Sequence, residues 1–201
     1  MKDTYRTITQ PSSETLFKDR NSKFYGYAYP VKTENDIKEY IASLKKQHHQ
    51  ARHWCYAYVL GETYDQYRAN DDGEPSNSAG APIYGQLQSF DITNVLVVVV
   101  RYFGGTKLGV GGLINAYRSS AQLAIEASDI ITKTIDVVFK INFEYPLLNK
   151  VMRLIKDYDV TIIEQIMELQ CNFTLSIRKK EAEVIIQKFE EVYGINLIDD
   201  D

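Results

Sequence analysis

The strongest constraint on the fold is an apolar strand that runs directly into a glycine-rich turn. Residues 94–101 are rich in β-branched side chains and apolar on both faces, as expected at the centre of a sheet. Apolar residues at helical spacing follow from Leu113 to Ile125, with polar residues between them. The chain must therefore contain a central strand that turns sharply into a helix covering the sheet. The turn holds five glycines within nine residues: Gly104, Gly105, Gly109, Gly111 and Gly112.

The residues before this strand predict another strand and then a helix. Residues 24–30 are strand-like. Thr33 and Asp36 then offer an N-cap and a nearby carboxylate for a helix start. Apolar residues recur at the spacing of one helical face from Ile37 to Leu44.

The aromatic-rich segment 53–60 predicts a strand with two different faces. Cys55, Ala57 and Val59 share one face, and three aromatic side chains alternate with them on the other. Small side chains on one face predict close packing by a helix. Residues 70–82 are predicted to form a turn-rich loop.

Composition changes near Lys133, which predicts two domains. Residues 1–133 contain 15 of the 23 Lys and Arg and 14 of the 27 Asp and Glu. The residues after Lys133 contain the other 8 basic and 13 acidic residues. Ten of the 11 glycines also precede it. From Thr134 onward the predicted elements follow the βαββαβ order of ferredoxin-like domains. We therefore expect an α+β protein with domains at residues 1–133 and 134–201.

Composition excludes several classes of protein. Hydrophobic residues make up 44% of the chain and charged residues 25%, which is typical of a globular protein. Two distant cysteines and three histidines bunched between positions 48 and 53 offer neither a disulfide framework nor zinc spacing. Charges throughout the first twenty residues argue against a signal peptide, and no apolar run approaches the roughly 20 residues that span a bilayer. We expect a cytoplasmic protein without a metal or cofactor.

The segment from Arg101 to Gly112 has the composition of an anion-binding turn. Glycines let backbone N–H groups approach an anion, and a helix N-terminus adds about half a positive charge. Arg101 and Lys107 supply full charges. The spacing matches neither a Walker loop nor the dinucleotide fingerprint, which disfavours ATP and NAD. The alternative is that the glycines only permit a tight turn with close packing.

The predicted loop carries a short acidic segment, Asp71, Asp72, Gly73 and Glu74. Its carboxylates could ligate a hard cation, but the spacing lacks the distal glutamate of an EF-hand. A turn with solvated acids is the favoured interpretation. A third interpretation is that these acids pair with Arg52 or Arg101 and hold those side chains in place.

His53 and Cys55 share a strand face, which suggests a nucleophilic pair as one reading. Neighbours two positions apart on a strand project side by side and do not converge, and no third orienting residue is identifiable. A buried, structural Cys55 is favoured, and no catalytic residue is expected. His48 and His49 end the predicted helix and are assigned no chemistry.

Three ordered blocks of the chain resemble the Impact family. They are ARHWCYAY at 51–58, DDGEPS with AGAP at 71–82, and TNVLVVVVRYFGGTKLGVGGLI at 93–114. The resemblance spans nearly the whole chain and extends to the bacterial, YigZ-like branch of the family, which carries a similar second domain. It implies a first domain with the βα fold of ribosomal-protein and elongation-factor domain IV relatives. The second domain would be ferredoxin-like and resemble domain V of elongation factor G.

The resemblance also implies a translation-linked role. In eukaryotic relatives the first domain binds a co-activator of a starvation-responsive kinase of translation initiation. Two positions depart from the family pattern: Asn77-Ser78 stand where glycine and threonine are usual, and Asn115 stands where arginine is usual. The second departure removes a charge beside the expected anion site.

We expect a non-enzymatic binding protein that regulates translation by docking on RNA or the ribosome through a basic face. One alternative is a module that binds a translation-regulatory protein, and another is an enzyme that acts on a phosphorylated small substrate. No membrane partner is expected. The acidic segment would support the RNA- or anion-binding residues, which are Arg52, His53, Arg101, Gly104, Gly105, Thr106, Lys107, Gly109 and Arg118.

Overall fold

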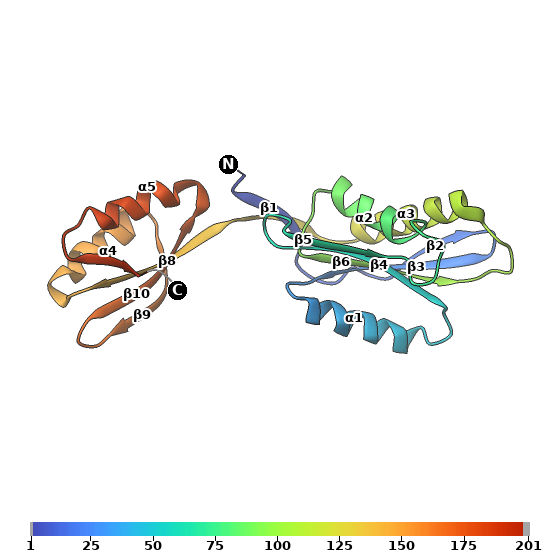
Figure 1. Ribbon diagram of the computed structural model, residues 1–201, viewed down its shortest axis with the longest axis horizontal. Coiled ribbons are helices and arrows are strands. Elements are labelled where there is room, and N and C mark those ends of the chain that lie inside the picture. Colours follow the sequence, from blue (N-terminus) through green and yellow to red (C-terminus); the bar gives the residue numbers. More distant parts are fainter. Residues whose placement is uncertain (1, 199–201) are drawn as a thin grey trace. The chain divides into compact units, whose positions relative to one another are not determined.

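The computed structural model describes residues 2–198, which divide into two compact units (Figure 1). One unit is Tyr5–Lys133, and the other comprises residues 134–198 together with residues 2–4. The division falls after Lys133 and groups residues 2–4 with the second unit. Asp3 joins the second unit because its carbonyl accepts a hydrogen bond from the Ile135 backbone N–H at 2.8 Å, and its carboxylate pairs with Arg178 at 2.7 Å. The expected α+β, two-domain fold class is confirmed.

The first unit is built on an antiparallel sheet with the strand order β2-β3-β6-β4-β5. The central strand β6 has every residue from Val95 to Val100 fully buried, because both faces of the sheet are covered. The bounds are β2 (Thr15–Asp19), β3 (Ser22–Pro30), β4 (His53–Leu60), β5 (Gln66–Asn70) and β6 (Val95–Tyr102).

Helices cover the two faces of this sheet unequally (Figure 1). Helices α2 (Gly80–Ser89) and α3 (Gly109–Glu126) pack on the face that carries Cys55 and Ala57. Helix α1 (Glu34–Gln47) packs on the opposite, tyrosine-rich face. The expected division of β4 into a small-residue face and an aromatic face is therefore confirmed, as is the Thr33 cap of α1.

Several elements of this unit are absent from the sequence-based expectation. Strands β1 (Thr4–Ile8) and β7 (Ile130–Thr134) form a two-stranded ribbon, and β2 and β5 are the sheet edges. Helix α2 begins inside the predicted loop, so the expectation of a loop over residues 70–82 is wrong for its last three residues. Its first turn is capped from a distance, because the Asp71 carboxylate accepts hydrogen bonds from the Ala79 and Gly80 backbone N–H groups at 3.0 and 2.8 Å.

The second unit has the expected ferredoxin-like topology. Its antiparallel sheet has the order β11-β8-β10-β9, and helices α4 and α5 pack on one face of it. Alternate residues of β10 are buried beneath these helices, and the residues between them are half-buried. The bounds are β8 (Asp136–Phe143), a 3₁₀ turn (Tyr145–Leu147), α4 (Leu148–Asp157), β9 (Thr161–Met167), β10 (Cys171–Arg178), α5 (Lys179–Glu190) and β11 (Ile195–Ile198).

Candidate functional site

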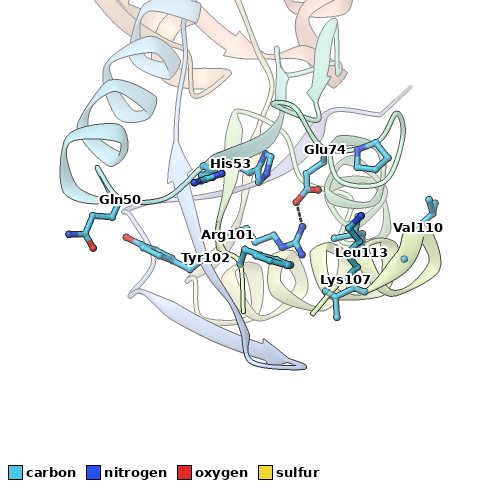
Figure 2. A pocket seen from close by; sticks show the side chains of 13 residues that line it. Gln50, His53, Glu74, Arg101, Tyr102, Lys107, Val110 and Leu113 are labelled. Atoms are coloured by element: carbon cyan, nitrogen blue, oxygen red, sulfur yellow. Dashed lines mark hydrogen bonds and ion pairs between the residues drawn. The ribbon is translucent and has the colours of Figure 1, made fainter. Parts of the chain in front are cut away.

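A cavity of about 700 Å³ opens where β4 starts, β6 ends and α3 begins (Figure 2). It is lined by six of the residues selected from the sequence, namely Arg52, His53, Glu74, Arg101, Lys107 and Gly109. Its other walls are mainly apolar or aromatic, with Phe103, Leu108, Val110 and Leu113 among them. The remaining candidate residues lie outside the lining: Asp71, Asp72, Gly73, Gly104, Gly105, Thr106 and Arg118.

The inner wall of the cavity is a buried ion pair. Arg101 Nη1 lies 2.6 Å from Glu74 Oε1, and the two side chains are 7% and 4% exposed. The Tyr117 hydroxyl donates a second hydrogen bond to the same carboxylate oxygen, at 2.7 Å. The Arg101 guanidinium also lies against the Phe24 and Phe103 rings, 5.5 and 5.6 Å from their centroids. The interpretation that an acid of the loop holds Arg101 in place is confirmed for Glu74.

This pairing assigns Arg101 a different role from that of an exposed phosphate ligand. Its charge is compensated by Glu74, and its buried Nε has no hydrogen-bond partner among the residues that the structure describes. Figure 2 shows the guanidinium directed toward Glu74, with Lys107 and Val110 on the α3 side of the cavity. Arg101 therefore shapes the wall and does not carry a free charge into the cavity.

Cys55 lies behind this wall, fully buried. Its thiol contacts the Asp71 carbonyl at 2.9 Å and the Tyr117 hydroxyl at 3.3 Å. Burial is the main cause that raises the pKa of the Cys55 thiol far above its ordinary value, and it raises the pKa of Tyr117 in the same way. The expectation that Cys55 is buried is confirmed, and a buried thiol with a raised pKa is typical of a structural cysteine.

Asp71 and Asp72 of the acidic segment accept hydrogen bonds from backbone N–H groups of neighbouring segments. Besides capping α2, Asp71 accepts a hydrogen bond from the Asn77 N–H at 2.9 Å. Asp72 accepts one from the Trp54 N–H at 2.7 Å, and the Asp72 carbonyl contacts His53 Nδ1 at 2.8 Å. The favoured interpretation of solvated acids is wrong for these residues, because folding brings backbone donors to each of them. No group of three or more His, Cys, Asp or Glu side chains within residues 2–198 could hold a metal ion.

The glycine-rich turn combines two structural needs. Gly104 packs on the turn between β2 and β3, where a Cβ would lie 2.1 Å from the Asn21 backbone carbon. Gly105 has a φ of +87°, which L-amino acids with side chains rarely adopt. By contrast, a Cβ on Gly111 would meet open space. Packing and turn geometry therefore explain Gly104 and Gly105, whereas neither explains Gly111.

The positive charge available at the cavity belongs to Arg52 and Lys107. Both side chains are exposed, and neither has an ion-pair partner in the described part of the chain. Phe103 lines the same cavity and is 56% exposed. The first turn of α3 has no acidic residue and no side-chain cap. Arg118 is exposed on α3, outside the cavity.

A buried histidine lies next to the cavity, and the sequence pattern did not predict it. His48 ends α1, and its Nε2 and Nδ1 lie 2.5 and 3.0 Å from the hydroxyls of Tyr27 and Tyr102. Tyr27 donates its own proton to the Glu14 carboxylate, so in a neutral His48 ring Nε2 donates to Tyr27 and Nδ1 accepts from Tyr102. Tyr102 lines the cavity. No local signal marks His48, because its partners come from distant strands.

Comparisons with known proteins identify relatives of this chain by sequence and by structure. The chain matches the family model "Impact N-terminal domain" over residues 20–125. An IMPACT family member from Haemophilus influenzae is 33% identical over 185 residues, which cover 90% of each chain. The IMPACT family member YigZ from Escherichia coli is 36% identical over 128 residues, or 63% of each chain. A crystal structure of a hypothetical protein aligns with 100% of this chain and 99% of its own, with a TM-score of 0.74 at 24% identity, and has the same fold.

Proposed function

Because the chain belongs to the IMPACT family, we propose that it regulates translation by binding single-stranded RNA, free or on the ribosome, at the cavity beside Lys107. The translation-linked part of the proposal follows from the role that this family implies. The RNA-binding part is supported chiefly by one observation: the exposed aromatic ring of Phe103 lines the same cavity as the unpaired cations Arg52 and Lys107. Composition supports a cytoplasmic location.

The chemistry of the cavity suits a single strand better than a duplex. An exposed aromatic ring stacks on an unpaired base, and such stacking contributes about 1–3 kcal/mol per base. Lys107 and Arg52 would neutralise the adjoining phosphates, while the Arg101–Glu74 pair keeps the wall rigid and electrically neutral. The bases of a duplex are already stacked on each other, so Phe103 could not reach their faces.

The test is the salt dependence of RNA affinity, measured with a fluorescein-labelled single-stranded RNA. Each neutralised phosphate contributes a slope of about −0.7 in a plot of log affinity against log salt, so two cations give about −1.4. The double variant Arg52→Gln/Lys107→Gln should have a slope near zero. Phe103→Ala should weaken binding about tenfold while keeping the slope, because it removes stacking and no charge.

The matched control is Lys38→Gln, which removes an exposed cation from α1 on the other face of the sheet. It should retain both affinity and slope. If the double variant binds RNA with wild-type affinity and slope while its melting temperature is unchanged, the cavity is not the RNA site.

The apolar lining favours a second candidate, a module that binds a translation-regulatory protein. Phe103 and Val110 are both exposed at the cavity, and the buried Leu113 also lines it. An acidic peptide with an apolar anchor would fit these walls and the two cations. A cavity that binds such a peptide but gives no measurable RNA affinity would support this candidate over the first.

A further inference from the structure

The second unit has an exposed apolar surface at one end of its sheet. Two hollows of about 640 and 730 Å³ lie there, and they share Glu144, Pro146 and Gln170 in their linings. They therefore form one continuous surface, built by the 3₁₀ turn after β8, the β9–β10 hairpin and the loop before β11. We refer to residues 144–146, 168–170 and 192–194 as the hairpin-end surface.

Three large apolar side chains of this surface are in contact with water. Leu169 at the hairpin tip is 97% exposed, Tyr193 is 98% exposed and Tyr145 is 48% exposed. Tyr145 and Leu169 line one hollow, and Tyr193 lines the other. Single exposed apolar residues are common, but a group of them around adjoining hollows is typical of a site for a protein partner. Tyrosine is also among the residue types that dominate binding energy at such sites.

The charges around these side chains indicate what the partner carries. Glu144, Glu168 and Glu190 line the two hollows, and no Lys or Arg appears in either lining within the described residues. The sequence after Lys133 also carries 8 Lys and Arg against 13 Asp and Glu. A polyanion such as RNA would be repelled here, whereas a cationic segment would be attracted.

We propose that the hairpin-end surface is a docking site for a protein segment in which lysine or arginine residues flank an apolar side chain. The apolar side chain would enter the hollows beside Leu169 and Tyr193. The flanking cations would pair with Glu144 and Glu168. This inference does not depend on RNA binding by the first unit, because it uses different residues and the opposite charge.

The test uses the full chain, labelled with ¹⁵N, and three synthetic peptides. The first peptide has six lysines and two leucines, the second replaces the lysines by glutamates, and the third replaces the leucines by serines. With the first peptide we expect amide shifts confined mainly to the hairpin-end surface. The other two peptides should bind at least about tenfold more weakly, because each lacks one of the two recognised features.

Variants of the hairpin-end surface distinguish binding of the peptide at this surface from nonspecific electrostatic attraction to the whole protein. Leu169→Ser and Tyr193→Ser should each weaken the first peptide about tenfold. Val184→Ser, at an exposed position of α5 outside both linings, is the control and should not. The proposal is overturned if about 1 mM of the first peptide causes no shifts at the surface, or if the acidic peptide binds equally well. A single-stranded RNA that shifts the same amides would overturn it too, and would identify a nucleic-acid site instead.

Discussion

Glu74 holds two side chains of the cavity wall at once. Its carboxylate accepts hydrogen bonds from Arg101 and from Tyr117, and all three groups are buried. An isolated charge in such a place is costly, because it has lost its hydration without gaining a counter-charge. The stability of the wall therefore depends on Glu74 and Arg101 being present together.

Removing the charge of Glu74 tests this dependence. Glu74→Gln should lower the free energy of unfolding by about 3–5 kcal/mol, because the Arg101 charge then stays buried without compensation. The double variant Glu74→Gln/Arg101→Met should recover part of the loss. Urea denaturation measures both effects, with the exposed Glu62→Gln as the control. A loss below about 1 kcal/mol in the single variant would mean that the pair behaves as a surface ion pair.

His48 connects α1 to the strand that ends at the cavity. Burial lowers the pKa of His48, and the Glu14 carboxylate opposes this effect without cancelling it. The neighbouring titratable groups are Tyr25 and Tyr27 of β3 and Tyr102 of β6. The folded state therefore binds a proton at His48 less readily than the unfolded state does.

A pH-dependent stability follows from this difference. Below the ordinary histidine pKa of about 6.5, the unfolded chain takes up a proton that folded His48 resists, so the free energy of unfolding falls as the pH is lowered. We expect wild type to lose stability between pH 7.5 and 5.5, and His48→Gln to lose less over the same range. The exposed His49→Gln is the control. Identical pH profiles for wild type and His48→Gln would show that His48 does not contribute.

Helix α3 and the turn before it form the element on which the cavity depends most. Gly104 is needed there for packing, since a Cβ would lie 2.3 Å from the Ser22 backbone nitrogen, whereas Gly111 in the first turn of the helix faces open space. Gly111→Ala should therefore raise the free energy of unfolding by about 1 kcal/mol through helix propensity. Gly104→Ala should lower it by more than that. Thermal or urea unfolding measures the free energy of unfolding of both variants. Equal changes in this free energy would show that Gly104 is not needed for packing.

Elements whose signal lies in neighbouring residues could be predicted from the sequence. The alternation in β4, the apolar run of β6 and the Thr33 cap of α1 are local, and each agrees with the structure. Helix α2 could not be predicted because its glycines and proline resemble a loop and its cap, Asp71, lies outside it in the chain. The ribbon of β1 and β7 could not be predicted either, because its two strands come from opposite ends of the first unit and pair only after folding.

The candidate site was predictable in position but not in the role of each side chain. Residue types alone placed Arg101 and Lys107 at the glycine turn, and the cavity brings Arg52 to them. Which of the three charges is compensated depends on Glu74, whose approach to Arg101 follows from the path of a loop. Sequence spacing does not report that path, so phosphate binding by Arg101 and its pairing with an acid of the loop both stayed open.

On the scale of the whole molecule, each unit closes its own core. Both apolar clusters of the first unit use residues between Ile8 and Ile130, and that of the second uses residues between Val137 and Leu197. We therefore propose that residues 5–133 fold independently as the Impact-type domain. The fragment should be monodisperse and melt in one cooperative transition by circular dichroism. Aggregation, or melting without a transition, would show that the second unit completes the first core.

The two units also differ in the charge that they offer to partners. The cavity of the first exposes Arg52 and Lys107, while the hollows of the second are lined by glutamates. RNA should accordingly contact the first unit and avoid the second. This division of partners is the central claim about how the molecule acts.

Photo-crosslinking of the full chain to a 4-thiouridine RNA, followed by trypsin digestion and mass spectrometry, tests that claim most directly. Cleavage after Arg101 and Lys107 releases the segment 102–107, which contains Phe103. We expect this peptide to carry the main crosslink and Phe103→Ala to reduce the yield of that crosslink. Crosslinks confined to peptides after residue 134, or none at an RNA concentration that saturates binding, would contradict it.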